Sequence, residues 1–166
     1  MSRTFTVSGS IDIEASADLL YAMVSDVARM GEWSPENRGS TVLDDGPIAE
    51  GHRFEGSNRR GRASWVTRCT VTAAEPGAHF AFRVHQIGVS RPRIAGPNAS
   101  WDYRFEPLPG GGTRVTETWI DDRRAWPDPV ARVFDAVVTG GKTFAEFQRG
   151  NIDRTLANLK RVAESR

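Results

Sequence analysis

The sequence has few of the residues and segments that stabilise a fold covalently or anchor it in a membrane. Its 166 residues include a single cysteine, Cys69, which excludes an intramolecular disulfide and a cysteine-based zinc cluster. The N-terminal residues lack the apolar core of a signal peptide, and no apolar run is long enough to span a bilayer. We therefore expect a cytoplasmic protein without a membrane span, folded around its own hydrophobic core.

An excess of charge of one sign is also missing. The formal net charge is +1, so we expect no strong field for nucleic acid and no nucleic-acid partner. The three histidines, His52, His79 and His85, are scattered and match neither a metal-binding spacing nor a Ser–His–Asp arrangement. The sequence therefore predicts no metal and no cofactor.

The chain begins with a strand pattern and then a helical one. Apolar and polar residues alternate over residues 4–13, which is typical of a half-buried strand. Ser16 is a candidate N-cap for a short helix. Asp26 is a candidate start for a second short helix that would end near Gly31 and Pro35.

A period-two pattern then continues through most of the remaining chain. Strands are predicted at 38–44, 50–58, 62–74, 78–86, 99–107 and 113–121. The short connections between them contain glycine and proline, which indicates antiparallel neighbours in a meander. A short helix is then expected, with Asp128 as N-cap, Pro129 in its first turn, and an apolar face formed by Val130, Val133, Phe134 and Val137.

The last predicted helix, about residues 143–164, is amphipathic. Phe144 and Ile152 lie on its apolar stripe, but Gln148, Asn151 and Thr155 project along the same stripe. Polar side chains on a buried face need partners. Two interpretations are open: these side chains bond neighbouring backbone, or the helix faces a partly hydrated cavity.

Together these elements predict an α+β fold of one domain, residues 1–166. A curved antiparallel sheet that wraps around the long C-terminal helix would bury the apolar face of each. Glu117 lies between Val115 and Trp119 on the inward face of the last predicted strand. A buried carboxyl needs a partner or its proton, so Glu117 is either a structural ion pair or hydrogen bond, or a ligand-orienting or acid/base group.

Arginines gather at the end of the sheet where alternate turns of a meander meet. We expect the 58–62 turn, the 87–98 loop and the 121–128 connection to form one rim there. Its cavity-mouth candidates are Arg59, Arg60, Arg62, Arg91, Arg93, Arg123 and Trp126, with Arg124 beside them. These arginines either solvate turns or attract an anionic head group or an acidic carrier protein.

Several segments are similar to a known family. DVARMGEWSPE at 26–36, GHRFEGSNRRGRASWVTRCTVTAAEPGAHFAFRV at 51–84, GGGTRVTETW at 110–119 and NIDRTLANLK at 151–160 resemble the bacterial polyketide cyclase/dehydrase-like branch of the START-related helix-grip (SRPBCC) superfamily. This resemblance implies a seven-stranded sheet around the C-terminal helix, two short helices after the first strand, and an internal cavity for a hydrophobic molecule. The pocket-lining positions it implies are Trp33, Phe54, Asn58, Trp65, Phe82, Trp101, Tyr103, Glu117, Trp119, Phe144, Gln148, Asn151 and Ile152.

The predicted fold and the family resemblance are compatible with three functions. The first is binding of a hydrophobic or amphipathic small molecule that is lipid-, fatty-acyl- or polyketide-like. The second is a cyclase/dehydratase-type enzyme, with Glu117 as proton shuttle and Tyr103 polarising a carbonyl. The third is a chaperone- or ribosome-associated regulator that acts through the arginine rim. The oligomeric state is left open between a monomer and a homodimer.

Overall fold

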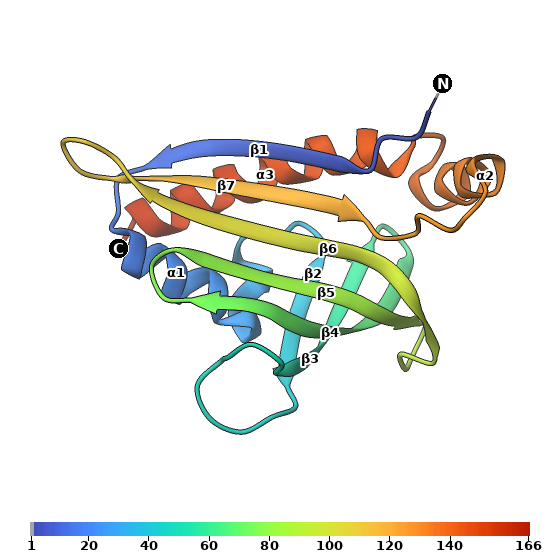
Figure 1. Cartoon of the computed structure of the whole chain (residues 1–166), viewed down its shortest axis with the longest axis horizontal. Coiled ribbons are helices and arrows are strands. Elements are labelled where there is room, and N and C mark those ends of the chain that lie inside the picture. The colour runs from blue at the N-terminus through green and yellow to red at the C-terminus, as the bar shows by residue number, and fades with distance from the viewer. Residues whose placement is uncertain (1) are drawn as a thin grey trace.

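The structure, a computed structural model, describes residues 2–166 as a long curved sheet with helices at both ends (Figure 1). The strands are β1 (Thr6–Ile13), β2 (Asn37–Val42), β3 (Arg53–Arg60), β4 (Ala63–Glu75), β5 (His79–Gly88), β6 (Ile94–Pro107) and β7 (Thr113–Asp121). The helices are α1 (Ala17–Ser25), the 3-10 helix η1 (Val27–Glu32), α2 (Asp128–Thr139) and α3 (Phe144–Glu164).

The sheet is the antiparallel meander that the sequence predicts. Its order is β1-β7-β6-β5-β4-β3-β2, so consecutive strands from β2 to β7 are neighbours and β1 pairs with β7. Register places Tyr103 opposite Glu117 and Trp101 opposite Trp119 across β6 and β7. These side chains therefore share the inward face, where α3 runs along β1 and β7 (Figure 1).

The predicted N-cap of the first helix is confirmed, and the structure adds a second cap at the start of the last helix. The Ser16 side chain accepts a hydrogen bond from Leu19 N at the start of α1. Thr143 and Glu146 form a capping box at the start of α3, because each side chain bonds the other residue's backbone N–H. The long helix therefore begins at the predicted position.

The second short helix starts where it was predicted, because η1 follows Asp26 as its N-cap, although the Asp26 side chain makes no cap bond. Two other predicted element starts were wrong. Helix α2 has Pro127 as its N-cap and begins at Asp128, because the fixed φ of proline suits the entry to a helix. Strand β6 begins at Ile94 rather than residue 99, because Ile94 and Ala95 extend the pairing with β5.

One end of the molecule has a solid core. Helix α1 lies there, and Leu20 and Phe80 are fully buried beside Val115 and Leu159. The Tyr21 ring packs edge-on against Phe80, with ring centroids 6.3 Å apart. The inward face of the sheet is filled at this end by α1 and by the C-terminal half of α3.

Gly9 allows α3 to lie close to the sheet. A Cβ at this position would approach the Ile152 side chain to 2.8 Å. Gly9 is paired with Glu117 across β1 and β7. The close approach therefore sets α3 at the level of Glu117, with Ile152 over the strand.

Helix α2 exposes the apolar face that the sequence suggested for burial. Val130, Val133, Phe134 and Val137 are 54%, 66%, 43% and 79% exposed, whereas Ala131 on the other side is fully buried. The face that α2 buries is centred on Ala131 and a charged residue, Asp135.

In the described part of the chain, no helix is long and apolar enough to cross a membrane.

Candidate ligand-binding cavity

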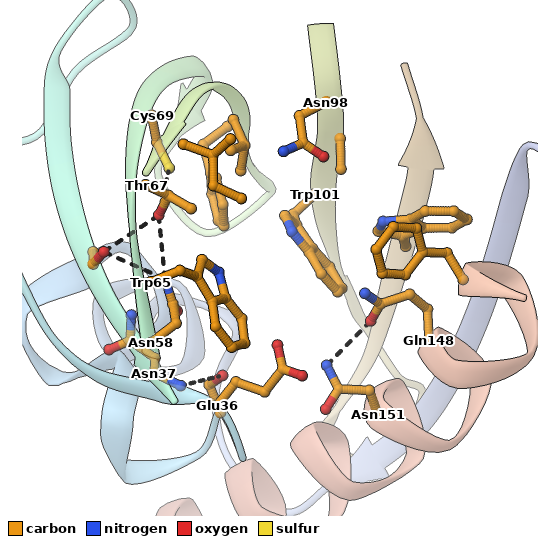
Figure 2. A pocket seen from close by; sticks show the side chains of 18 of the residues that line it. Glu36, Asn37, Asn58, Trp65, Thr67, Cys69, Asn98, Trp101, Gln148 and Asn151 are labelled. Carbon is orange, nitrogen blue, oxygen red and sulfur yellow. Dashed lines mark hydrogen bonds between the residues drawn. The ribbon is translucent and has the colours of Figure 1, made fainter. Parts of the chain in front are cut away.

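A cavity of about 650 Å³ lies between the sheet and the first half of α3. Strands β3 to β7 form its curved wall, and α3 and α2 form the facing side. Figure 2 shows Trp65 and Trp101 beside the cavity and Gln148 and Asn151 reaching toward it from α3. The three polar positions of the α3 stripe, Gln148, Asn151 and Thr155, therefore face a cavity rather than a solid core.

Most of the predicted lining positions border this cavity. They are Phe54, Asn58, Trp65, Phe82, Trp101, Tyr103, Glu117, Trp119, Phe144, Gln148 and Asn151. Two predicted positions, Trp33 and Ile152, do not line it, and each is only 1% exposed. Trp33 lies in the core and accepts a bond from Asn158 through its carbonyl, and Ile152 is turned toward Gly9.

The predicted mouth divides into two groups. Arg60, Arg123 and Trp126 line the cavity. The other four arginines, Arg59, Arg62, Arg91 and Arg93, are exposed on or beside turns and do not line it. For these four the expected mouth position is corrected, because each is exposed to solvent and none borders the cavity.

Glu117 and Tyr103 form a buried hydrogen-bonded pair in the cavity wall. The Tyr103 hydroxyl donates to Glu117 Oε1 at 2.9 Å, and Glu117 is 1% exposed. Burial raises the pKa of the Glu117 carboxyl to about 8, although the bond from Tyr103 acts in the opposite direction. Burial and the neighbouring Glu117 also raise the pKa of Tyr103 well above its usual value. Both groups are therefore protonated near neutral pH.

The opposite wall carries neutral polar groups. Asn58 Nδ2 donates to Thr67 Oγ1 at 3.3 Å, and this hydroxyl also bonds the Gly56 carbonyl (Figure 2). The Cys69 thiol lies 3.9 Å from the same hydroxyl. Burial raises the pKa of Cys69 to about 12, so its thiol is an unreactive lining group.

Arg60 connects three elements at the cavity edge. It bonds the Glu36 carboxylate at 2.5 Å and the Val138 carbonyl at the end of α2 at 3.1 Å. Its guanidinium also lies 3.7 Å from the centroid of the Phe147 ring of α3. Arg60 is therefore a structural link between the sheet and the two C-terminal helices.

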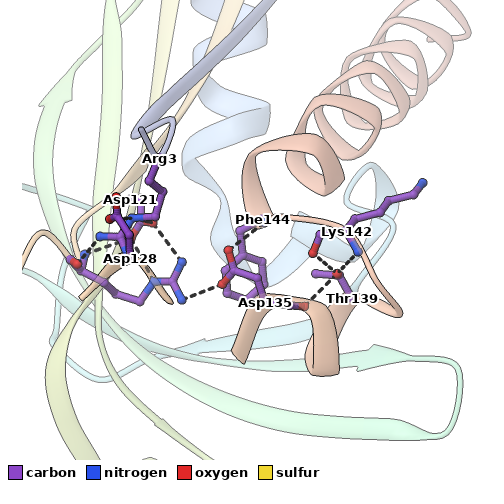
Figure 3. Close-up of polar contacts among 8 residues, drawn as sticks. Arg3, Asp121, Asp128, Asp135, Thr139, Lys142 and Phe144 are labelled. Atoms are coloured by element: carbon purple, nitrogen blue, oxygen red, sulfur yellow. Dashed lines mark hydrogen bonds and ion pairs between the residues drawn. The ribbon is translucent and has the colours of Figure 1, made fainter. Parts of the chain in front are cut away.

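Arg123 belongs to a buried ion-pair cluster that anchors α2. Its guanidinium pairs with Asp121 at 2.9 Å and with Asp135 at 2.8 Å. Figure 3 shows Asp135 also next to Phe144, whose backbone N–H it accepts at 3.0 Å. Although burial acts to lower the pKa of Arg123, the two carboxylates raise it above its usual value. The predicted mouth cation is thus neutralised by the protein itself.

The sequence reasoning missed Asp135 and Glu36. Asp135 carries a signal, since an acidic residue with the apolar neighbours Phe134 and Ala136 in the middle of a predicted helix needs a partner if it is buried. Glu36 gives no such signal, because its pairing with Arg60 depends on strand β3 folding back beside it. Among the described residues, no group of three His, Cys, Asp or Glu side chains could hold a metal ion.

Comparison with known proteins gives this fold and cavity a family. The family model described as "Polyketide cyclase / dehydrase and lipid transport" matches residues 4–164. The chain belongs to this family. A search of curated proteins finds no match.

Solved structures agree with this assignment. The chain is 31% identical to a Polyketide_cyc-like protein from Corynebacterium glutamicum, over 99% of this chain and 94% of that one, with a TM-score of 0.59. It also resembles a START superfamily protein from Mycobacterium smegmatis, with a TM-score of 0.70 and 15% identity over 98% and 99% of the two chains. The second likeness shows the fold alone. The predicted helix-grip fold is confirmed.

Proposed function

We propose that this protein binds a hydrophobic or amphipathic small molecule in the cavity between its sheet and α3. The observation that carries the proposal is the cavity of about 650 Å³, which lies within the size range of small-molecule sites. Its wall is mainly aromatic and aliphatic, and only a few polar groups interrupt it. Such a wall favours a ligand that is apolar over most of its surface. In this proposal residues 1–166 act as one domain.

The family supports this proposal only at a coarse level. Its description names both cyclase/dehydrase activity and lipid transport, and both imply a hydrophobic ligand. The description does not identify the ligand of this chain, because one fold serves many functions. The class of ligand is therefore inferred from the residues that line the cavity.

Native mass spectrometry of the purified protein, followed by denaturing extraction, tests the proposal. We expect a small-molecule adduct whose extracted component is apolar. The Ala99→Phe variant is the matched control, because Ala99 lines the cavity and a benzyl group there would occupy part of it. A folded Ala99→Phe protein that retains the same adduct would place the ligand elsewhere and contradict the proposal.

A cyclase/dehydratase-type activity is the second candidate, and one observation favours it. Glu117 holds its proton near neutral pH beside Tyr103 in the cavity wall, as a general acid requires. The exposed arginines on the neighbouring turns, Arg59, Arg62, Arg91 and Arg93, would suit an acidic carrier protein that delivers a substrate. Turnover of a poly-keto substrate that Glu117→Gln abolishes would support this activity, and unchanged turnover in the variant would exclude Glu117 as the acid.

A further inference from the structure

Two lining residues each present an oxygen without a hydrogen-bond partner. Among the described residues, Glu117 Oε2 and Asn151 Oδ1 are buried and unpartnered. Glu117 is 1% exposed and Asn151 is 4% exposed, and both border the cavity. A buried polar group without a partner is costly, so each oxygen calls for a partner inside the cavity.

The two oxygens need opposite kinds of partner. Glu117 Oε1 already accepts from the Tyr103 hydroxyl, so the carboxyl proton belongs on Oε2, which becomes a donor. Asn151 Nδ2 donates to Gln148 Oε1 at 3.2 Å, which leaves Asn151 Oδ1 as an acceptor. Among the fully buried side-chain oxygens of the cavity wall, Glu117 Oε2 is therefore a donor without a partner and Asn151 Oδ1 is an acceptor without a partner.

Both residues lie at the same level of the cavity. Glu117 pairs with Gly9, and the Ile152 side chain lies over Gly9 because that residue has no Cβ. Asn151 precedes Ile152 on α3 and faces the cavity (Figure 2). Strand β7 thus presents the donor and α3 presents the acceptor to one region.

Among the described residues, no charged side chain that lines the cavity is free to pair with a charged ligand group. Apart from Glu117, the charged lining residues are Glu36, Arg60 and Arg123. Arg60 is paired with Glu36, and Arg123 is paired with Asp121 and Asp135. A ligand carboxylate would therefore be buried without a free cation.

We propose that the ligand is uncharged and places a hydroxyl group between Glu117 and Asn151. The hydroxyl oxygen accepts from Glu117 Oε2, and the hydroxyl proton is donated to Asn151 Oδ1. A ketone satisfies only the first bond, and a hydrocarbon satisfies neither. This inference rests on the proposed binding function and narrows its ligand class.

Tryptophan fluorescence titration with dodecanol, dodecanoate, dodecylamine and dodecane tests the proposal. Trp65, Trp101 and Trp119 line the cavity and report its occupation. At about pH 7 we expect dodecanol to bind about tenfold or more tightly than each of the other three probes. Asn151→Leu and Glu117→Leu should each reduce this preference to about twofold or less while dodecane still binds.

The Glu117→Gln variant separates a donor role from a purely structural one. Its amide can accept from Tyr103 and donate to the ligand at any pH. The wild type should lose dodecanol affinity as pH rises through about 8, where Glu117 ionises, whereas Glu117→Gln should keep it. Circular dichroism at each pH checks that both proteins remain folded.

The outcomes distinguish this inference from the broader function. Equal binding of dodecanol and dodecanoate, or a preference for dodecylamine, would overturn the hydroxyl and leave cavity binding intact. Dodecanol affinity that Asn151→Leu leaves unchanged would also overturn it. Failure of all four probes to bind would contradict both this inference and the proposed function.

Discussion

The same sheet runs through both ends of this molecule, but its inward face covers a solid core at one end and a cavity at the other. At the α1 end, Leu20, Phe80 and Leu159 are fully buried in a solid core. At the α2 end, the same inward face of the sheet borders a cavity of about 650 Å³. Alternation of apolar and polar residues therefore selects a buried face, but it does not decide whether that face is filled.

What covers the sheet makes the difference. At the solid end, the apolar side of α1 and the C-terminal half of α3 close over the strands. At the hollow end, α3 presents Gln148, Asn151 and Thr155, and α2 turns Val133 and Val137 outward. Helix α2 is instead held by the Arg123–Asp135 ion pair.

Two phenylalanines on β5 give the sharpest test of this difference. Phe80 is fully buried against Tyr21, whereas Phe82 packs against Phe54, with ring centroids 5.2 Å apart, and lines the cavity. We expect Phe80→Ala to lower the free energy of unfolding by about 4 kcal/mol, and Phe82→Ala by roughly half of that, because Phe82 already borders empty space. Urea denaturation of both variants measures the two losses, and equal losses would mean that the cavity is filled by side chains.

Glu117 at the hollow end should make stability depend on pH in an unusual direction. The folded protein keeps the proton until about pH 8, whereas an unfolded chain releases it near the ordinary pKa of 4.5. The folded state therefore binds more protons in this window, and this group lowers stability as pH rises from 4.5 to 8. At about pH 7, Glu117→Gln should raise the free energy of unfolding by roughly 3 kcal/mol, since each pKa unit is worth about 1.4 kcal/mol.

The comparison with acid pH provides the control for this prediction. At about pH 4 the difference between Glu117→Gln and the wild type should nearly vanish, because the carboxyl is then largely protonated in both states. Denaturation curves of both proteins at several pH values measure this difference in the free energy of unfolding. A constant difference across the range would show that the pKa of Glu117 is the same in the folded and unfolded protein, which would leave the carboxyl ionised at neutral pH.

The outward face of α2 should be the least sensitive part of the hollow end. Val137 is 79% exposed, so Val137→Ser should change the free energy of unfolding by no more than about 0.5 kcal/mol. The same denaturation assay measures this effect. A loss several times larger would mean that another molecule covers this face in solution, and size-exclusion chromatography of both proteins would show whether that molecule is a second copy.

The sequence predicted the fold well because its signals are local and repeated. Period-two runs and turn residues identified the strands, and Ser16 and Thr143 mark helix starts through bonds within a few residues. The inward position of Glu117 followed from alternation with Val115 and Trp119, and burial confirms it. The start of β6 was missed because Ile94 joins the strand only through pairing with β5.

The candidate site was predicted less completely. Most lining residues followed from the inward face and from the family resemblance. The positions of Trp33 and Ile152 were wrong because burial alone does not separate a side chain that faces a cavity from one that packs behind it. The role of Arg123 was also misplaced, since its neutralisation depends on Asp135, twelve residues away on another element.

The sequence by itself determined the elements, their order and the faces they bury, because periodicity and capping act over short distances along the chain. Only the tertiary structure decided where the interior is solid and where it is hollow. That outcome depends on how closely separate elements approach, as Ile152 does over Gly9. The tertiary structure also decided which polar groups are paired. Tyr103 on one strand donates a hydrogen bond to Glu117 on the next, whereas Glu117 Oε2 and Asn151 Oδ1 have no hydrogen-bond partner in the protein.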